Sequence, residues 1–189
     1  TRAAAFLDRD GVIVEDVHFL RKREDLHILP GVVDALYSLQ EQFYTIVVTN
    51  QSGVARGLLT EDDLMVLHSE LVRRLSAKGV VVDAIYYCPH LPGAPIEQYR
   101  VVCDCRKPAP GMFLRARHDW GIDMTRSFTV GDNTRDVEAG RAAGGRGILL
   151  RDKKAAIAES AQPSTDLPAP SRPIPDPCRT HPACCSHGF

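Results

Sequence analysis

The sequence contains no apolar stretch long enough to cross a membrane, which takes about 20 consecutive apolar residues. Its beginning also lacks the basic and apolar segments of a secretory signal. An excess of charge of one sign is missing too, because 23 basic residues oppose 24 acidic ones. Such a balance favours neither a nucleic-acid nor a membrane partner. From the missing span and signal we expect a cytoplasmic protein, and we also expect a monomer.

Internal repeats are absent as well, and 189 residues are enough for one well-cored domain but few for two. The pattern changes near residue 150, after which proline, serine and alanine dominate and periodicity fades. We expect one domain over residues 1–150 and a disordered tail over 151–189. The tail carries soft metal ligands without a visible scaffold, so we interpret them as an incidental cluster: Cys178, His181, Cys184, Cys185 and His187.

Cysteine is absent from the first 87 residues and then occurs three times in a short segment. Three clustered cysteines are an odd number for disulfides, and a cytosolic location favours metal binding. The pattern CxH followed later by CxC supplies four soft or borderline ligands, which suits a closed tetrahedral zinc site. A redox pair or unrelated cysteines are the alternatives. The predicted zinc ligands are Cys88, His90, Cys103 and Cys105.

Four ligands leave no open position for a substrate, so this zinc is expected to be structural. The segment between the two ligand pairs has no helical or strand pattern of its own. A metal would therefore hold a long loop in place and fix the two residues directly after its last ligand, Arg106 and Lys107.

Short apolar runs alternate with segments of helical periodicity along the first 150 residues. This alternation predicts an α/β fold, with a Rossmann-like parallel sheet between two helical layers. The connections are too short for a separate cap domain, so the segment 15–25 and the zinc-stabilised loop should wall the site. The expected strands are 3–7, 44–48, 80–87, 127–130 and 147–150, and helices are expected from 31, over 61–78, from 110 and after 132.

Polar residues recur where the predicted strands end, and in parallel sheets ligands bind at this edge. Asp8, Asp10 and Asp132 would repel one another there unless a cation lay between them, and oxygen ligands of this kind suit Mg²⁺. A phosphate ester bound to such an ion needs further positive charge and hydrogen-bond donors. Lys107, Thr49 and the backbone N–H groups of residues 50–53 could supply them.

A carboxylate can attack phosphorus and form an aspartyl-phosphate, and Asp8 is placed for this. Asp10 could protonate the leaving oxygen and then activate water, while Gly11 would permit the tight turn between the two. Other interpretations exist for each piece in isolation. DRDG also resembles part of a calcium loop, Asp132 could cap a helix, and Lys107 could be a surface lysine.

Four motifs in order, FLDRDG, VVTNQSG, CRKP and VGDNTRD, resemble those of the haloacid dehalogenase superfamily of phosphatases, from residue 3 to about 150. The resemblance implies that Asp8 is the nucleophile and Asp10 the general acid and base. It also implies that Thr49 and Lys107 bind the transferring phosphoryl group. Mg²⁺ would be held by Asp8, the backbone carbonyl of Asp10 and Asp132, with Asp136 in support.

The cysteine loop, YYCPH and NQSGVARG resemble the heptose bisphosphate phosphatases within this superfamily. This implies removal of the 7-phosphate of D-glycero-D-manno-heptose 1,7-bisphosphate, a step towards the nucleotide-activated heptose of lipopolysaccharide. A histidinol-phosphate phosphatase is the alternative, and a non-catalytic phosphosugar-binding module is the alternative from another class. The residues expected to contact the substrate are Asp16, Val17, His18, Phe19, Asn50, Gln51, Ser52 and Arg106, the last through the second phosphate.

Overall fold

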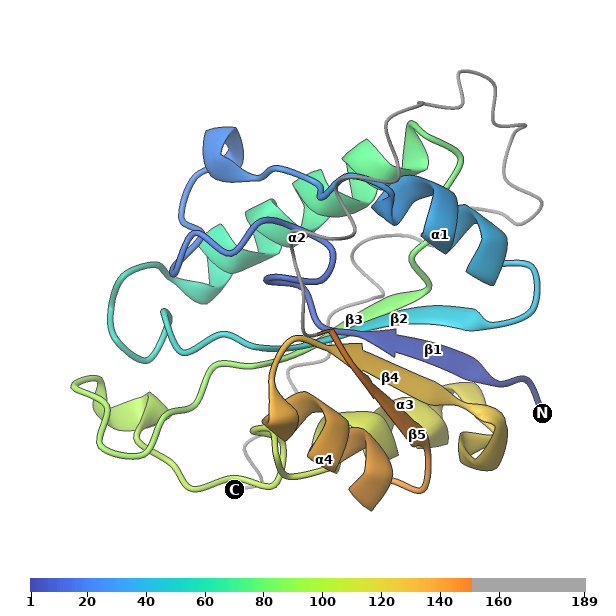
Figure 1. Cartoon of the computed structure of the whole chain (residues 1–189). Coiled ribbons are helices and arrows are strands. Elements are labelled where there is room, and N and C mark those ends of the chain that lie inside the picture. Colours follow the sequence, from blue (N-terminus) through green and yellow to red (C-terminus); the bar gives the residue numbers. More distant parts are fainter. Residues whose placement is uncertain (151–189) are drawn as a thin grey trace.

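A computed structural model describes residues 1–150 and contains one parallel sheet of five strands (Figure 1). The strands run in the order β3-β2-β1-β4-β5, so the chain builds outward from β1 first on one side and then on the other. The ends of each strand differ from the predicted ends by at most a few residues. They are β1 Ala4–Leu7, β2 Tyr44–Asn50, β3 Ala84–Cys88, β4 Phe128–Gly131 and β5 Arg146–Leu149.

Two helices cover each face of this sheet, which confirms the predicted three layers (Figure 1). The helices α1 Val32–Leu39 and α2 Glu61–Ser76 lie on one face. The helices α3 Gly111–Trp120 and α4 Thr134–Ala142 lie on the other. Short 3-10 helices are found in the connections, at Arg23–Asp25, Glu97–Tyr99 and Met124–Arg126.

The apolar core is divided by the sheet into two clusters, because successive side chains of a strand point to opposite faces. Leu7 of β1 packs in the cluster beneath α1 and α2, whereas its neighbour Phe6 packs with Phe113 of α3 on the other face. All four residues of β1 are buried, as expected for a central strand covered on both sides. The core therefore holds β1, and with it the residues that follow, in one fixed position.

The predicted strand 80–87 begins later in the structure, at Ala84. Val80, Val81 and Val82 are buried like a strand but do not join the sheet. The backbone N–H of Val81 donates instead to the side chain of Gln40, and Asp83 then pairs with Thr45 through both its backbone and its carboxylate. The predicted start of this strand was therefore wrong, because an apolar, buried segment belongs to the sheet only where its backbone hydrogen-bonds to the next strand.

The segments between β1 and α1 and between β3 and α3 carry no separate cap domain, as predicted. The second of these contains the 3-10 helix Glu97–Tyr99, which the sequence did not predict. No helix among the described residues is long and apolar enough to cross a membrane. The predicted tail and its cysteine cluster lie outside the described residues.

Candidate active site and thiol cluster

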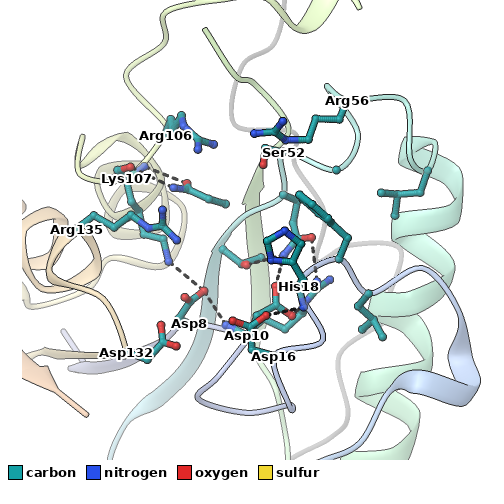
Figure 2. Close-up of a pocket in the computed structure, with 18 residues that line it drawn as sticks. Asp8, Asp10, Asp16, His18, Ser52, Arg56, Arg106, Lys107, Asp132 and Arg135 are labelled. Atoms are coloured by element: carbon teal, nitrogen blue, oxygen red, sulfur yellow. Dashed lines mark hydrogen bonds and ion pairs between the residues drawn. The ribbon is translucent and has the colours of Figure 1, made fainter. Parts of the chain in front are cut away.

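The polar residues predicted at the strand ends do converge, at the carboxyl edge of the sheet where β1 lies between β2 and β4. They line a pocket of about 280 Å³ (Figure 2). Lining residues predicted from the sequence are Asp8, Asp10, Asp16, His18, Phe19, Thr49, Asn50, Gln51, Ser52, Arg106, Lys107 and Asp132. Leu20 and Gly53 also line it and come from segments that were predicted to border the site. Those that the sequence analysis gave no role in the site are Arg9, Arg56, Leu59 and Arg135.

Asp8 is the first residue after β1, and its carboxylate is nearly buried. Its Oδ1 accepts a hydrogen bond from the backbone N–H of Arg9 at 2.8 Å and lies 3.0 Å from the ammonium of Lys107. Burial raises the pKa of Asp8 to about 6, Lys107 opposes this rise, and the charges of Asp136 and Asp10 add to it. The ionised form of Asp8 is therefore disfavoured in this site, and a bound cation would stabilise it.

Lys107 is buried and placed between two carboxylates, with its ammonium 3.0 Å from Asp8 and 2.8 Å from Asp136. The ammonium also donates to the backbone carbonyl of Val48 at 2.7 Å. A reciprocal pair of hydrogen bonds joins the backbone of Lys107 to the side-chain amide of Asn50. The interpretation of Lys107 as a surface lysine is therefore wrong.

Three carboxylates, those of Asp8, Asp132 and Asp136, lie within 4.8 Å of one another. Asp136 is fully buried in the first turn of α4 and accepts the backbone N–H of Asn133, which is the N-cap of that helix. Asp132 is thus not the helix cap. A Cβ on Gly131 would come within 2.2 Å of Asp136, so only glycine lets β4 end this close to the carboxylate.

Asp10 and Thr49 are joined through the amide of Gln51. The amide nitrogen donates to Oδ2 of Asp10 at 2.9 Å and to the hydroxyl of Thr49 at 2.8 Å. The Thr49 hydroxyl therefore accepts from Gln51 and can donate its own proton into the pocket. Gly11 follows with φ 77°, the left-handed conformation that the predicted turn needs.

Three arginines surround the part of the pocket away from Asp10 (Figure 2). Arg106 is half-buried and donates to the backbone carbonyl of His90, whereas Arg56 and Arg135 are exposed. Burial lowers the pKa of Arg106, and the charges of Arg135 and Arg56 lower it further. Such a cluster of like charges beside carboxylates is suited to an anion larger than one phosphate.

Arg56 and Arg135 were missed although both lie within quoted motifs, NQSGVARG and VGDNTRD. A motif does not tell which way an exposed side chain points, and only the fold brings these two next to Arg106.

Asp16, His18 and Phe19 of the predicted wall do line the pocket. His18 takes a positive φ of 71°, and its backbone N–H donates to the carboxylate of Asp16. Val17 is half-exposed and is not among the lining residues.

The four predicted soft ligands come together where β3 ends. Their ligand atoms lie within 4.8 Å of one another, with sulfur separations of 3.1 to 3.6 Å and His90 Nδ1 at 3.5 and 3.7 Å from two of the sulfurs. Ligands about 2.3 Å from a tetrahedral zinc would be separated by similar distances. All three cysteines are free thiols, and only Cys103 is partly exposed. The cluster fits one metal ion of that kind.

A parallel sheet that presents carboxylates, a buried lysine and a hydroxyl at one edge agrees with the predicted resemblance to phosphatases of the haloacid dehalogenase (HAD) superfamily. Residues 104–171 match the family model described as HAD-hydrolase-like. A D-glycero-beta-D-manno-heptose-1,7-bisphosphate 7-phosphatase of Rhodopseudomonas palustris is 46% identical over 76% of this chain and 80% of its own. The enzyme of that name from Escherichia coli K12 is 44% identical over 80% of both.

Two solved structures that resemble this chain are also named heptose bisphosphate phosphatases. The D,D-heptose 1,7-bisphosphate phosphatase of B. bronchiseptica, complexed with magnesium and phosphate, is 34% identical and covers 86% of this chain and 89% of its own, with a TM-score of 0.71. The corresponding phosphatase of Burkholderia thailandensis is 26% identical, with coverages of 86% and 88% and a TM-score of 0.56. The chain belongs to the HAD-like phosphatases, in the group of these heptose bisphosphate phosphatases, and is a phosphoric monoester hydrolase.

Proposed function

We propose that this enzyme removes the 7-phosphate of D-glycero-D-manno-heptose 1,7-bisphosphate, a step in the biosynthesis of nucleotide-activated heptose. The observation that carries the proposal is the division of the pocket into two charged parts. One part holds Asp8 and Lys107, where a phosphoryl group can be transferred, and the other holds the three arginines. A substrate with a second phosphate across a sugar would contact both.

The arginine cluster also bears on the alternative substrate. Histidinol phosphate carries an ammonium group where the bisphosphate carries its second phosphate. Arg56, Arg106 and Arg135 would repel that ammonium and attract the phosphate. Charge alone therefore favours the sugar bisphosphate. The cytoplasmic location and the monomeric state stay predictions.

In the proposed reaction the Asp8 carboxylate attacks phosphorus. Both contacts that hold it engage Oδ1, so we assign the attack to Oδ2. As the new bond forms, the bond from phosphorus to the sugar oxygen breaks, and Asp10 gives its proton to that oxygen. A water then attacks the aspartyl-phosphate, gives its proton to Asp10, and releases Asp8 and inorganic phosphate.

Lys107 and Thr49 would hold the phosphoryl oxygens during both steps. Lys107 is kept in place by two carboxylates and a backbone carbonyl, and Thr49 is oriented by Gln51. Ser52 and the backbone N–H groups of residues 52 and 53 would add donors, whereas the N–H of Gln51 already donates to the carbonyl of Cys88. Lys107 and Thr49 are held before substrate arrives, which is the condition for electrostatic catalysis.

Two metal ions of different kind are proposed. Asp8, Asp132 and the backbone carbonyl of Asp10 would hold Mg²⁺, which fits the three close carboxylates and the raised pKa of Asp8. Bound there, Mg²⁺ would neutralise charge on the phosphoryl oxygens. Asp136 would instead position Lys107, because it already contacts that ammonium. Cys88, His90, Cys103 and Cys105 would hold a structural zinc.

A panel of phosphate esters tests the substrate assignment by release of inorganic phosphate. The panel contains both anomers of the heptose 1,7-bisphosphate, heptose 7-phosphate, histidinol phosphate and a hexose phosphate. We expect the highest kcat/KM for a heptose bisphosphate. A preference for histidinol phosphate would overturn the assignment.

A variant sharpens this test. Arg56→Met should lower kcat/KM for the bisphosphate by about tenfold or more, because a charge-assisted contact is lost. Turnover of heptose 7-phosphate, which has nothing for Arg56 to bind, should stay nearly unchanged. Arg115→Met, at an arginine on α3 that does not line the pocket, is the matched control. An equal loss on both substrates would contradict the proposed second phosphate site.

A further inference from the structure

Arg9 has no role in the mechanism above, yet its side chain is among the largest that are fully buried. Only 1% of the residue is exposed. A guanidinium at this depth is costly unless its N–H groups find partners, and removing the partners leaves an uncompensated charge. The question is therefore what a permanently charged side chain does between the two catalytic aspartates.

The guanidinium of Arg9 holds the neighbouring carboxylate of Asp10 by two hydrogen bonds, an arrangement called the clamp below. Its Nε donates to Oδ1 of Asp10 at 3.0 Å and one Nη donates to Oδ2 at 2.9 Å. This is the two-point contact for which the planar guanidinium is suited. Gln51 adds a third hydrogen bond to Asp10, again to Oδ2.

The clamp is itself held from two further elements. The Nη that contacts Asp10 also donates to the side-chain oxygen of Gln51 at 2.9 Å, and the other Nη lies 3.2 Å from Nε2 of His68. His68 is fully buried on α2, so this contact ties the helix to the end of β1. Because arginine stays charged, Nε2 of His68 must act as the acceptor.

We infer that Arg9, supported by His68, is a positioning residue for Asp10, which keeps one carboxylate oxygen directed at the ester oxygen of the substrate. This rests on the proposed function, since it concerns the acid that the reaction needs. Among the contacts above, Oδ2 accepts two hydrogen bonds and Oδ1 accepts one. A carboxylate oxygen has two acceptor positions, so we assign the transferred proton to Oδ1.

Proton transfer to the leaving oxygen gives the inference a specific signature. A sugar alkoxide is a poor leaving group and must be protonated as its bond to phosphorus breaks. The phenolate released from p-nitrophenyl phosphate leaves without that proton. A badly oriented Asp10 should therefore slow sugar phosphates much more than p-nitrophenyl phosphate, whereas a general loss of structure should slow both equally.

The test compares His68→Leu with His68→Gln in the full chain. Leucine removes the acceptor for Arg9, while the amide oxygen of glutamine can replace it. For His68→Leu we expect kcat on heptose bisphosphate to fall about tenfold, a part of the factor of about 10² to 10⁴ that a general acid contributes. The value on p-nitrophenyl phosphate should change less than about twofold, and His68→Gln should restore most of the loss.

Controls keep the inference separate from folding and from the proposed function. Gln40→Leu removes a partly buried hydrogen bond with Gly79 and a buried one with Val81 at the opposite end of the sheet, and should leave the ratio of the two rates unchanged. If His68→Leu fails to fold, Arg9→Lys, which cannot make the two-point contact, takes its place. Equal losses on both substrates, or none, in the chosen variant overturn the inference alone. An inactive parent enzyme would overturn the proposed function and the inference with it.

Discussion

The thiol cluster lies at the end of β3 and the carboxylate cluster at the ends of β1 and β4, on the same side of the sheet, yet the two clusters suit opposite purposes. In the first, four ligands surround one point and three of the four residues are buried. In the second, three carboxylates lie close together beside an open pocket, and two of them, those of Asp8 and Asp136, share the buried ammonium of Lys107. A metal in the first can only hold the chain together, whereas a metal in the second has room for substrate.

The two clusters are also connected. Arg106 follows the last thiol ligand and donates to the carbonyl of His90, and Lys107 follows Arg106 into the pocket. A metal bound to the thiol cluster would therefore set the positions of these two side chains in the other cluster. In this proposal the closed site would supply the rigidity that the open site needs.

The largest effect that would test this contrast is on the nucleophile. Asp8→Asn should lower kcat by about 10⁴-fold or more, because an amide cannot attack phosphorus. Circular dichroism should remain like that of the parent, since Lys107 keeps its contact with Asp136. Activity within about tenfold of the parent would show that Asp8 is not the nucleophile.

The next largest effect is expected at the closed cluster. Cys103→Ser should reduce bound zinc and lower the free energy of unfolding by several kcal/mol, because metal binding at such a site contributes directly to folding. Elemental analysis and urea unfolding measure the two together. Cys178→Ser, in the segment after residue 150, is the matched control. Full zinc in Cys103→Ser would show that the ligands are assigned wrongly.

A smaller effect on stability should follow from removing the Lys107 ammonium that Asp8 and Asp136 share. Lys107→Met leaves two buried carboxylates without their partner, so without Mg²⁺ the free energy of unfolding should fall by about 3 kcal/mol. Adding Mg²⁺ should recover part of this, because a second cation can compensate the same charges. Lys78→Met, at an exposed lysine, should change little. No rescue by Mg²⁺ would argue against a metal beside Asp8.

The smallest expected effect is a dependence of stability on pH in the presence of a chelator. The pKa of Asp8 is raised from 3.8 to about 6, so in this window the folded protein keeps a proton that the unfolded chain has released. The contribution is complete below pH 3.8 and is lost as the pH rises through about 6. Urea unfolding across this range measures it. In Asp8→Asn this part of the pH dependence of the free energy of unfolding should be missing. An unchanged pH dependence in the variant would contradict the assignment to Asp8.

Prediction and structure are best compared at the ends of the strands. Strand ends could be located from apolar runs followed by aspartate or threonine, and Lys107 could be located from its position directly after the cysteine ligands. This was enough to predict that Asp8, Thr49, Lys107 and Asp132 lie in one place. The start of β3 could not be located, because buried valines look alike whether or not their backbone pairs. The buried position of Arg9 was missed for a related reason, since a charged residue between two aspartates is expected to face solvent.

By itself, the sequence determined the alternation of strands and helices, the identity of the reactive groups and the spacing of the soft ligands. These follow from local patterns, because apolar periodicity and ligand chemistry are carried by neighbouring residues. Only the tertiary structure decided that Arg56 and Arg135 join Arg106, that Asp136 shares Lys107 with Asp8, and that His68 supports Arg9. Each of these contacts joins segments from different elements, and the direction of a side chain across such a distance depends on how the layers pack.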